Sequence, residues 1–91
     1  MNPESKLVIP AQVMSRLVGE ETVILDLASG HYFGLDGVGK LIWESVAKGK
    51  SLADAVDAIA AEYEVDKTRA EADVTAFANE LIERGLLTLQ T

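Results

Sequence analysis

The stretch LDLASGHYFGLD at residues 25–36, which continues into VGKLIW at residues 38–43, decides the fold. Apolar residues recur on both sides of the short Ala-Ser-Gly segment. A glycine in such a loop supplies the positive φ that a tight hairpin turn requires. The stretch therefore predicts a β-hairpin whose second strand leads directly into a helix.

A three-residue Ala-Ser-Gly loop sets the expected register of this hairpin. Leu25 would then lie opposite Phe33. Val23 would lie opposite Leu35, and all four apolar side chains would share the face that turns toward a core. A two-residue loop would instead pair Asp26 with Phe33 and bury a carboxylate beside an aromatic ring. We therefore expect the three-residue loop.

Further elements are predicted on both sides of the hairpin. The segment 13–18 is a strand candidate, joined to the hairpin by a polar turn at 19–21, which gives a three-stranded antiparallel sheet. Three helices follow, each with apolar residues at helical spacing and a polar residue placed to cap its first turn. Their expected N-caps are Asp36, Ser51 (with Asp54 completing a capping box) and Asp66, and their expected ends are Gly49, the break at 64–66 and Gly85.

The order β-β-β-α-α-α predicts an α+β domain, in an arrangement compatible with a winged helix-turn-helix. A chain of 91 residues makes one domain, which we expect to span residues 1–91, with residues 1–10 as a flexible tail. The segment 86–89 either adds a short final strand or packs against the core.

The composition bounds the function. With 48% hydrophobic and 25% charged residues, the chain reads as globular. It has no cysteine and one histidine, so we expect no disulfide, no metal site and no cofactor. No basic stretch followed by an apolar run opens the chain, and no window approaches the roughly 20 apolar residues of a membrane span. We expect a cytoplasmic protein without a membrane partner.

The charge argues against a nucleic-acid partner. Eight basic residues against 15 acidic ones give a net charge of −7, whereas phosphate neutralisation supplies most of the affinity for nucleic acid. The chain also lacks a Ser-His-Asp set, a nucleophilic cysteine and a phosphate-cradling glycine loop. We therefore expect a protein that is not an enzyme.

The hairpin and helices together resemble the PqqD-like family, the precursor-peptide recognition elements of ribosomally made, modified peptides. The resemblance extends from residue 13 to residue 89. The hairpin sequence is more similar to stand-alone members from lasso-peptide clusters than to PqqD of pyrroloquinoline quinone synthesis. The matching residues are Leu25–Asp26–Leu27, Ser29–Gly30, Tyr32–Phe33, Leu35–Asp36, Ile42–Trp43, Ser51–Leu52, Tyr63, Asp73–Val74, Phe77, Leu81 and Glu83–Arg84–Gly85–Leu86.

The resemblance implies a non-catalytic binding function. The leader of the precursor peptide would add as a further strand to the strand at 31–35, in a groove against the helix at 67–84, and would be delivered to a separate protease, cyclase or radical SAM enzyme. The candidate binding residues are His31, Tyr32, Phe33, Gly34 and Leu35 on the strand and Arg69, Asp73, Phe77 and Glu80 on the helix.

Simpler readings exist for several of these residues. Phe33 and Leu35 also suit an ordinary core, Arg69 and Asp73 suit a surface ion pair, and Glu80 has the spacing to pair with Arg84. Helical phase does not decide which margin of the third helix faces the strand. We expect the margin that carries Phe77.

Two alternatives concern the whole molecule. A winged-helix DNA-binding regulator would read DNA with the third helix, but residues 66–84 carry five acidic residues against three basic ones. An unpaired strand edge also pairs readily with a second copy, so both a monomer and an edge-mediated homodimer are compatible with the sequence.

Overall fold

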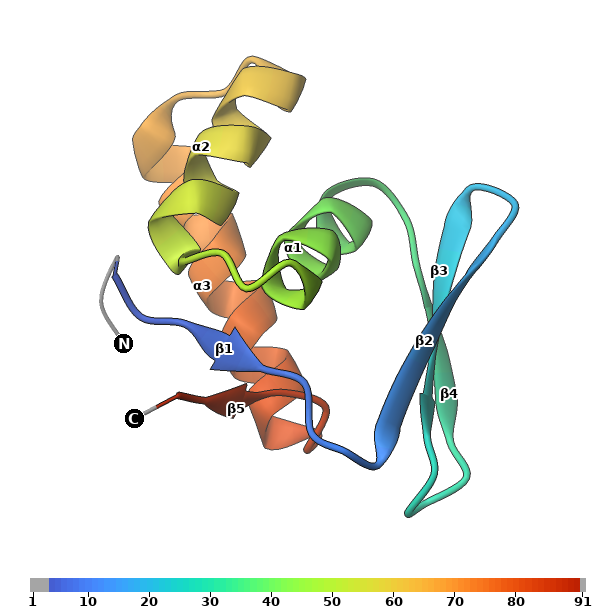
Figure 1. The fold of residues 1–91 in the computed structure, drawn as a ribbon. Helices are drawn as coiled ribbons and strands as arrows, with labels where there is room; N and C mark the ends of the chain where they lie inside the picture. Colours follow the sequence, from blue (N-terminus) through green and yellow to red (C-terminus); the bar gives the residue numbers. More distant parts are fainter. Residues whose placement is uncertain (1–3, 91) are drawn as a thin grey trace.

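A three-stranded antiparallel sheet stands beside three helices in the computed structural model, which describes residues 4–90 (Figure 1). The sheet has the order β2-β3-β4, and the helices follow it in the chain, so the expected α+β class and element order are confirmed. The bounds are β2 Val13–Val18, β3 Glu21–Asp26, β4 Tyr32–Leu35, α1 Gly37–Ala47, α2 Leu52–Tyr63 and α3 Lys67–Glu83.

The two ends of the chain form a second, smaller sheet. Strand β1 (Leu7–Val8) pairs antiparallel with β5 (Thr88–Leu89), so a segment early in the chain lies beside one late in the chain (Figure 1). Within the segment 1–10 that was expected to be a flexible tail, Leu7 is buried in the core, and residues 1–3 lie outside the described residues. The segment 86–89 both packs against the core and adds a short final strand, because Leu86 and Leu87 are buried and β5 follows them.

The expected hairpin register is wrong by one residue. Ile24, not Leu25, lies opposite Phe33, and Thr22, not Val23, lies opposite Leu35. The loop is longer than expected because Asp26 organises it: its carboxylate accepts hydrogen bonds from the Ala28 N–H at 3.0 Å and the Ser29 hydroxyl at 3.1 Å. Such a side chain extends a turn by mimicking backbone contacts. The core face of the hairpin therefore carries Ile24, which is fully buried.

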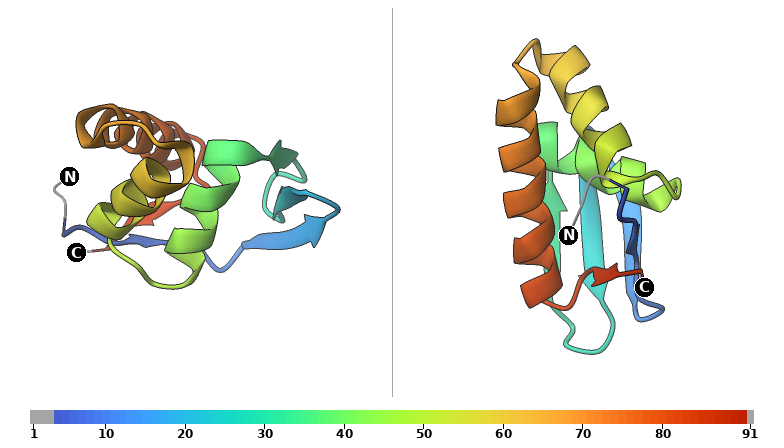
Figure 2. Two further views of the ribbon diagram at one scale, coloured as in Figure 1. Left: turned by 90° about the horizontal axis from the view of Figure 1, so that it is seen from above. Right: turned by 90° about the vertical axis from the view of Figure 1, so that its left-hand side faces the viewer.

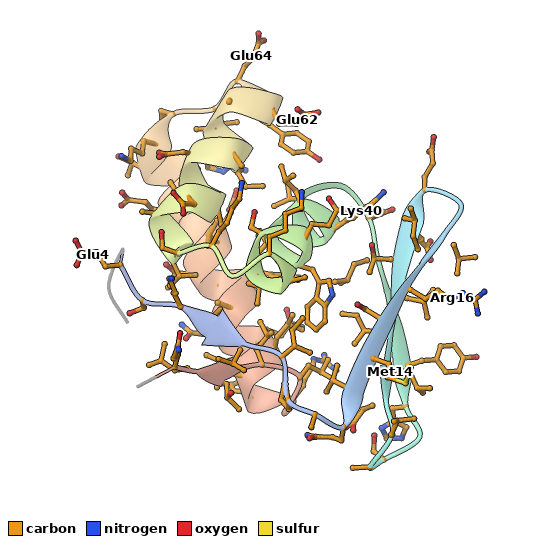
Figure 3. All side chains as sticks on the ribbon, in the orientation of Figure 1. Glu4, Met14, Arg16, Lys40, Glu62 and Glu64 are labelled. Atoms are coloured by element: carbon orange, nitrogen blue, oxygen red, sulfur yellow. The ribbon has the colours of Figure 1, made fainter. Side chains whose placement is uncertain are left out.

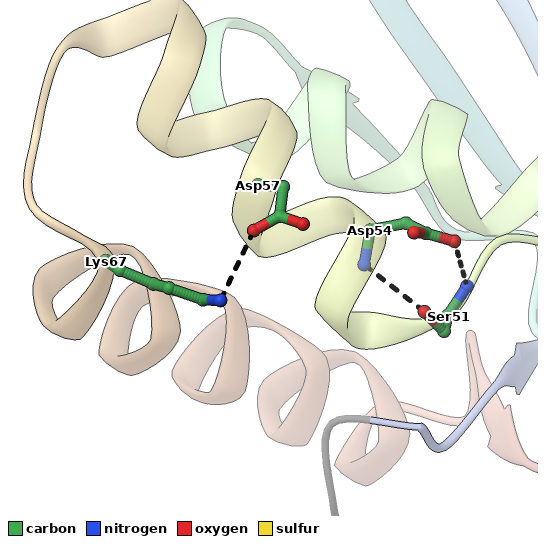
Figure 4. Close-up of polar contacts among 4 residues, drawn as sticks. All are labelled: Ser51, Asp54, Asp57 and Lys67. Atoms are coloured by element: carbon green, nitrogen blue, oxygen red, sulfur yellow. Dashed lines mark hydrogen bonds and ion pairs between the residues drawn. The ribbon is translucent and has the colours of Figure 1, made fainter.

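The helix caps follow the local sequence signals. Ser51 and Asp54 form a reciprocal capping box at the start of α2, with both hydrogen bonds at 3.2 Å (Figure 4). Asp66 caps α3 by accepting from the Arg69 N–H at 2.8 Å. The same figure shows the ion pair between Lys67 and Asp57 that joins the start of α3 to α2. The helix α3 is one residue shorter than expected, with Arg84 as its C-cap.

All three helices lie on one side of the β2-β3-β4 sheet, and the other side is uncovered (Figures 1 and 2). Arg16 points away from the helices on that uncovered side (Figure 3). The core lies between the sheet and the helices. Its largest fully buried side chains are Trp43, Ile24, Ile42, Ile59, Leu86, Leu87 and Val74.

Candidate functional site

Strand β4 has a free edge. Within residues 4–90 it pairs with β3 alone. The Asp26 N–H donates to the His31 carbonyl at 2.9 Å, which fixes which residues of the hairpin exchange hydrogen bonds. In an antiparallel pair these residues alternate, so Phe33 and Leu35 bond to β3 whereas the N–H and C=O groups of Tyr32 and Gly34 point outward. The edge thus offers two donors and two acceptors to another strand.

The helix α3 flanks this edge. In both views of Figure 2, β4 lies on the side of the sheet nearer to α3. The Arg84 guanidinium lies over the Phe33 ring, 5.3 Å from its centroid. Farther along, Gly39 of α1 brings the helix backbone against Phe77, since a Cβ built at position 39 would lie 3.0 Å from Phe77 Cε1. The margin of α3 that carries Phe77 therefore faces β4, as expected.

The surface between β4 and α3 is apolar and only partly covered. Phe33, Leu35, Val38 and Phe77 are each half-buried and pack against the hydrophobic core with their inner sides. We call these four residues, together with Gly39, the β4–α3 surface. Apolar groups that stay partly open beside a free strand edge are suited to receive side chains of an added strand.

Two ion pairs lie along the same margin of α3. Arg69 pairs with Asp73 at 3.5 Å and Arg84 pairs with Glu80 at 3.2 Å, each with i, i+4 spacing. The side chains are exposed, and such pairs contribute little to stability. Both ion pairs that the residue spacing predicted are therefore present on the surface of α3.

The expected site residues therefore divide into three groups, with His31 apart from them. Phe33, Leu35 and Phe77 converge on the β4–α3 surface. Tyr32 and Gly34 contribute the open backbone edge, with the Tyr32 side chain 74% exposed on the uncovered face of the sheet. The charged residues of α3 form its rim, and His31 is exposed at the end of the loop.

Three residues near the edge were missed. Arg84 was expected on the margin of Phe77 and as a partner of Glu80, but its position over the Phe33 ring was not expected. Gly39 permits the close approach of α1 to Phe77, and Glu21 of β3 lies against Gly34. A correct register would have found Glu21, because it places this residue two positions from the partner of Gly34.

Comparisons with known proteins agree with this geometry. The family model of coenzyme PQQ synthesis protein D (PqqD) matches residues 21–87, which is most of the chain. The chain belongs to the PqqD family. No curated protein sequence matches the chain significantly. The matched region of this PqqD-family chain includes the free edge, the β4–α3 surface and all of α3.

Two solved structures are similar to this PqqD-family chain over nearly its whole length. One is TbiB1 in complex with the TbiA(beta) leader peptide, at 42% identity and a TM-score of 0.84, covering 88% of this chain and 93% of that one. The other is lasso peptide synthetase B1 complexed with the leader peptide, at 30% identity and a TM-score of 0.84, covering 91% and 98%. The DNA-regulator alternative finds no support in these matches.

Among residues 4–90, no helix has both the length and the apolar character needed to cross a membrane.

Proposed function

We propose that this chain binds the leader segment of a ribosomally made precursor peptide and holds it for a separate modifying enzyme, without catalysing a reaction itself. The leader adds as a strand to the free edge of β4 and lays alternate side chains on the β4–α3 surface. The observation that carries the proposal is the open edge at Tyr32 and Gly34 beside Phe77 of α3. The 42% identity to TbiB1, whose complex contains a leader peptide, supports it.

The energetics require both the backbone edge and the side-chain surface. Four ladder hydrogen bonds contribute about 0.5–1.5 kcal/mol each, and each buried apolar anchor contributes about 1.5–3 kcal/mol. Association costs about 4–15 kcal/mol before the ordering of the peptide is counted. The backbone edge alone therefore does not bind, and the anchors on Phe33, Leu35 and Phe77 determine which peptide is held.

The separate enzyme is a protease, a cyclase or a radical SAM enzyme, and the chain acts in the cytoplasm as a single domain. Binding at the β4 edge would also compete with any dimer formed through the same edge. The leader-bound chain is therefore a monomer with respect to β4.

The first experiment searches the genome around the gene of this chain for a short precursor peptide and measures binding of its synthetic leader segment by fluorescence anisotropy. The variant Gly34→Pro removes one outward N–H, and it leaves the β3–β4 ladder intact because position 34 does not bond to β3. The control Gly34→Ala keeps the N–H. Both variants add a Cβ that displaces the Glu21 carboxylate, so their difference isolates the hydrogen-bond donor.

We expect saturable binding by the wild type and by Gly34→Ala, and at least about a ten-fold loss for Gly34→Pro. Circular dichroism verifies that both variants fold. Equal binding by the folded proline and alanine variants would rule out strand addition at β4.

A further inference from the structure

The carboxylate of Glu21 lies across the backbone of β4. A Cβ built on Gly34 would lie 2.6 Å from Glu21 Oε1 and 3.3 Å from its Cδ. Gly34 pairs with Val23, so Glu21 is its diagonal neighbour on the uncovered face of the sheet. Because position 34 has no side chain, Glu21 reaches over β4 toward the free edge. A side chain of β3 is thus placed near the edge where a strand added to β4 would lie, although β3 itself would not pair with that added strand.

Glu21 has no cationic partner within residues 4–90. The ion pairs found there join other residues. Glu21 lines an open depression together with Val18, Glu20, Asp36 and Gly37, and every charged side chain in that set is acidic. The ammonium of nearby Lys40 donates to the backbone carbonyl of Glu20 at 3.2 Å. Arg16, which pairs with Val23, lies on the same uncovered face but forms no ion pair with Glu21, so the Glu21 carboxylate is available to a cation on an added strand.

A strand added to β4 would place one side chain next to this carboxylate. Side chains of an added strand alternate between the two faces of the sheet, so one lies beside Gly34 and another, two positions away, beside Tyr32. Cross-strand neighbours have Cβ atoms about 4.5–5.5 Å apart, within reach of a lysine or arginine. The residue beside Gly34 meets Glu21 because glycine leaves that space open.

We propose that Glu21 is a specificity-determining residue that selects a lysine or arginine on the added strand, at the position next to Gly34 on the uncovered face. This inference rests on the proposed function, and it adds a charge requirement to the apolar anchors on the opposite face. Gly34 then has two roles, because its backbone forms the edge and its missing side chain admits the carboxylate.

The test is a selection from a displayed library of random 12-residue peptides on the full chain. Three proteins are compared: the wild type, Glu21→Lys, and Glu71→Lys as a control that makes the same change in net charge on an exposed position of α3. We expect the peptides selected by the wild type and by Glu71→Lys to be enriched in a basic residue at the position that lies next to Gly34. Glu21→Lys is expected to enrich an acidic residue there.

A selected peptide is then used to measure how much its basic residue contributes to the affinity. Replacing its basic residue by norleucine should weaken binding to the wild type about two- to five-fold at low salt, and the effect should shrink as salt is added. The same replacement should have no effect on binding to Glu21→Gln. If selected peptides bind and require the Gly34 N–H, but show no basic preference that Glu21 controls, the inference falls and the proposed function stands. If neither the library nor the synthetic leader yields binding, both fall.

Discussion

The two edges of the main sheet offer the same backbone chemistry in different surroundings. Strand β2 has six residues and lies at one edge, and β4 has four and lies at the other. On β2, the Leu27 N–H donates to the Gln12 carbonyl at 2.8 Å, which fixes which residues of β2 bond to β3. Because these residues alternate along an antiparallel pair, the backbone N–H and C=O groups of Ser15 and Leu17 point outward. The β2 edge is thus longer, but exposed side chains surround it, with Met14 57% and Leu17 61% exposed.

The edge of β4 differs because α3 lies beside it. The aromatic rings of Phe33 and Phe77 are half-buried there. Arg84 lies over the Phe33 ring, and the Gly39 backbone lies against the Phe77 ring. A strand added to β4 can bury side chains between the sheet and α3, whereas a strand added to β2 can only cover exposed side chains of the sheet itself, such as Met14 and Leu17. The comparison teaches that an available edge becomes a selective site when a second element supplies side-chain contacts.

The largest contrast is expected from matched prolines on the two edges. Ser15→Pro removes an outward N–H from β2, as Gly34→Pro does from β4, and neither removes a bond of the internal ladder. We expect leader affinity to fall at least about ten-fold for Gly34→Pro and to change less than about two-fold for Ser15→Pro. Isothermal titration calorimetry measures both. An equal loss at both edges would mean that the sheet responds as a whole and that the edges are not distinct.

The next contrast separates the two margins of α3. Phe77 and Ile82 are both half-buried against the core, but on opposite sides of the buried stripe of this helix. Each alanine substitution should lower the free energy of unfolding by about 2–4 kcal/mol. Only Phe77→Ala should also weaken leader binding, by about ten-fold, because it removes an apolar anchor. Urea unfolding and anisotropy provide the two values.

A smaller effect is expected at Gly39. The Cβ of Gly39→Ala would lie 3.0 Å from Phe77 Cε1 and 3.5 Å from Leu35 Cδ2, so the Phe77 ring must shift. Alanine in the first turn of α1 gains up to about 1 kcal/mol of helix propensity, which offsets part of the crowding. We expect little change in thermal stability with about a three-fold loss of leader affinity. A clear loss of stability without any loss of affinity would separate Gly39 from the site.

An effect of similar size is expected at Arg84. Arg84→Gln removes the cation over the Phe33 ring, a contact worth about 0.5–1 kcal/mol at an exposed site, so affinity should fall about two- to five-fold. Lys50→Gln removes the same charge at an exposed position beyond α1 and should leave affinity unchanged. If the two variants behave alike, the effect is one of net charge.

Local signals predicted much of the fold. The N-cap residues Asp36, Ser51 and Asp66 lie where the sequence placed them, because capping depends on residues within one helical turn; the side chains of Ser51 and Asp66 form capping hydrogen bonds, whereas that of Asp36 forms none. The hairpin register failed because residues 23–25 are apolar at every position, which removes the alternation that would identify the buried face. The Asp26 carboxylate then decided the loop length through contacts that apolar patterning does not record.

The site was predictable in part. The proposal that a peptide binds between the strand at 31–35 and the helix at 67–84 came from the family resemblance. The sequence pattern alone could not decide which margin of α3 faces β4. That choice depends on contacts between residues far apart in the chain, such as Arg84 with Phe33, and these have no local signature. The pairing of β1 with β5 was hidden for the same reason, since each strand has only two residues.

Amide hydrogen exchange, followed by NMR with and without saturating leader peptide, tests the central claim most directly. The account predicts that the N–H groups of Tyr32 and Gly34 become protected at least about ten-fold on binding, while those of Ser15 and Leu17 keep their exchange rates. Saturable binding that leaves Tyr32 and Gly34 unprotected, or that protects the β2 edge in their place, would contradict it.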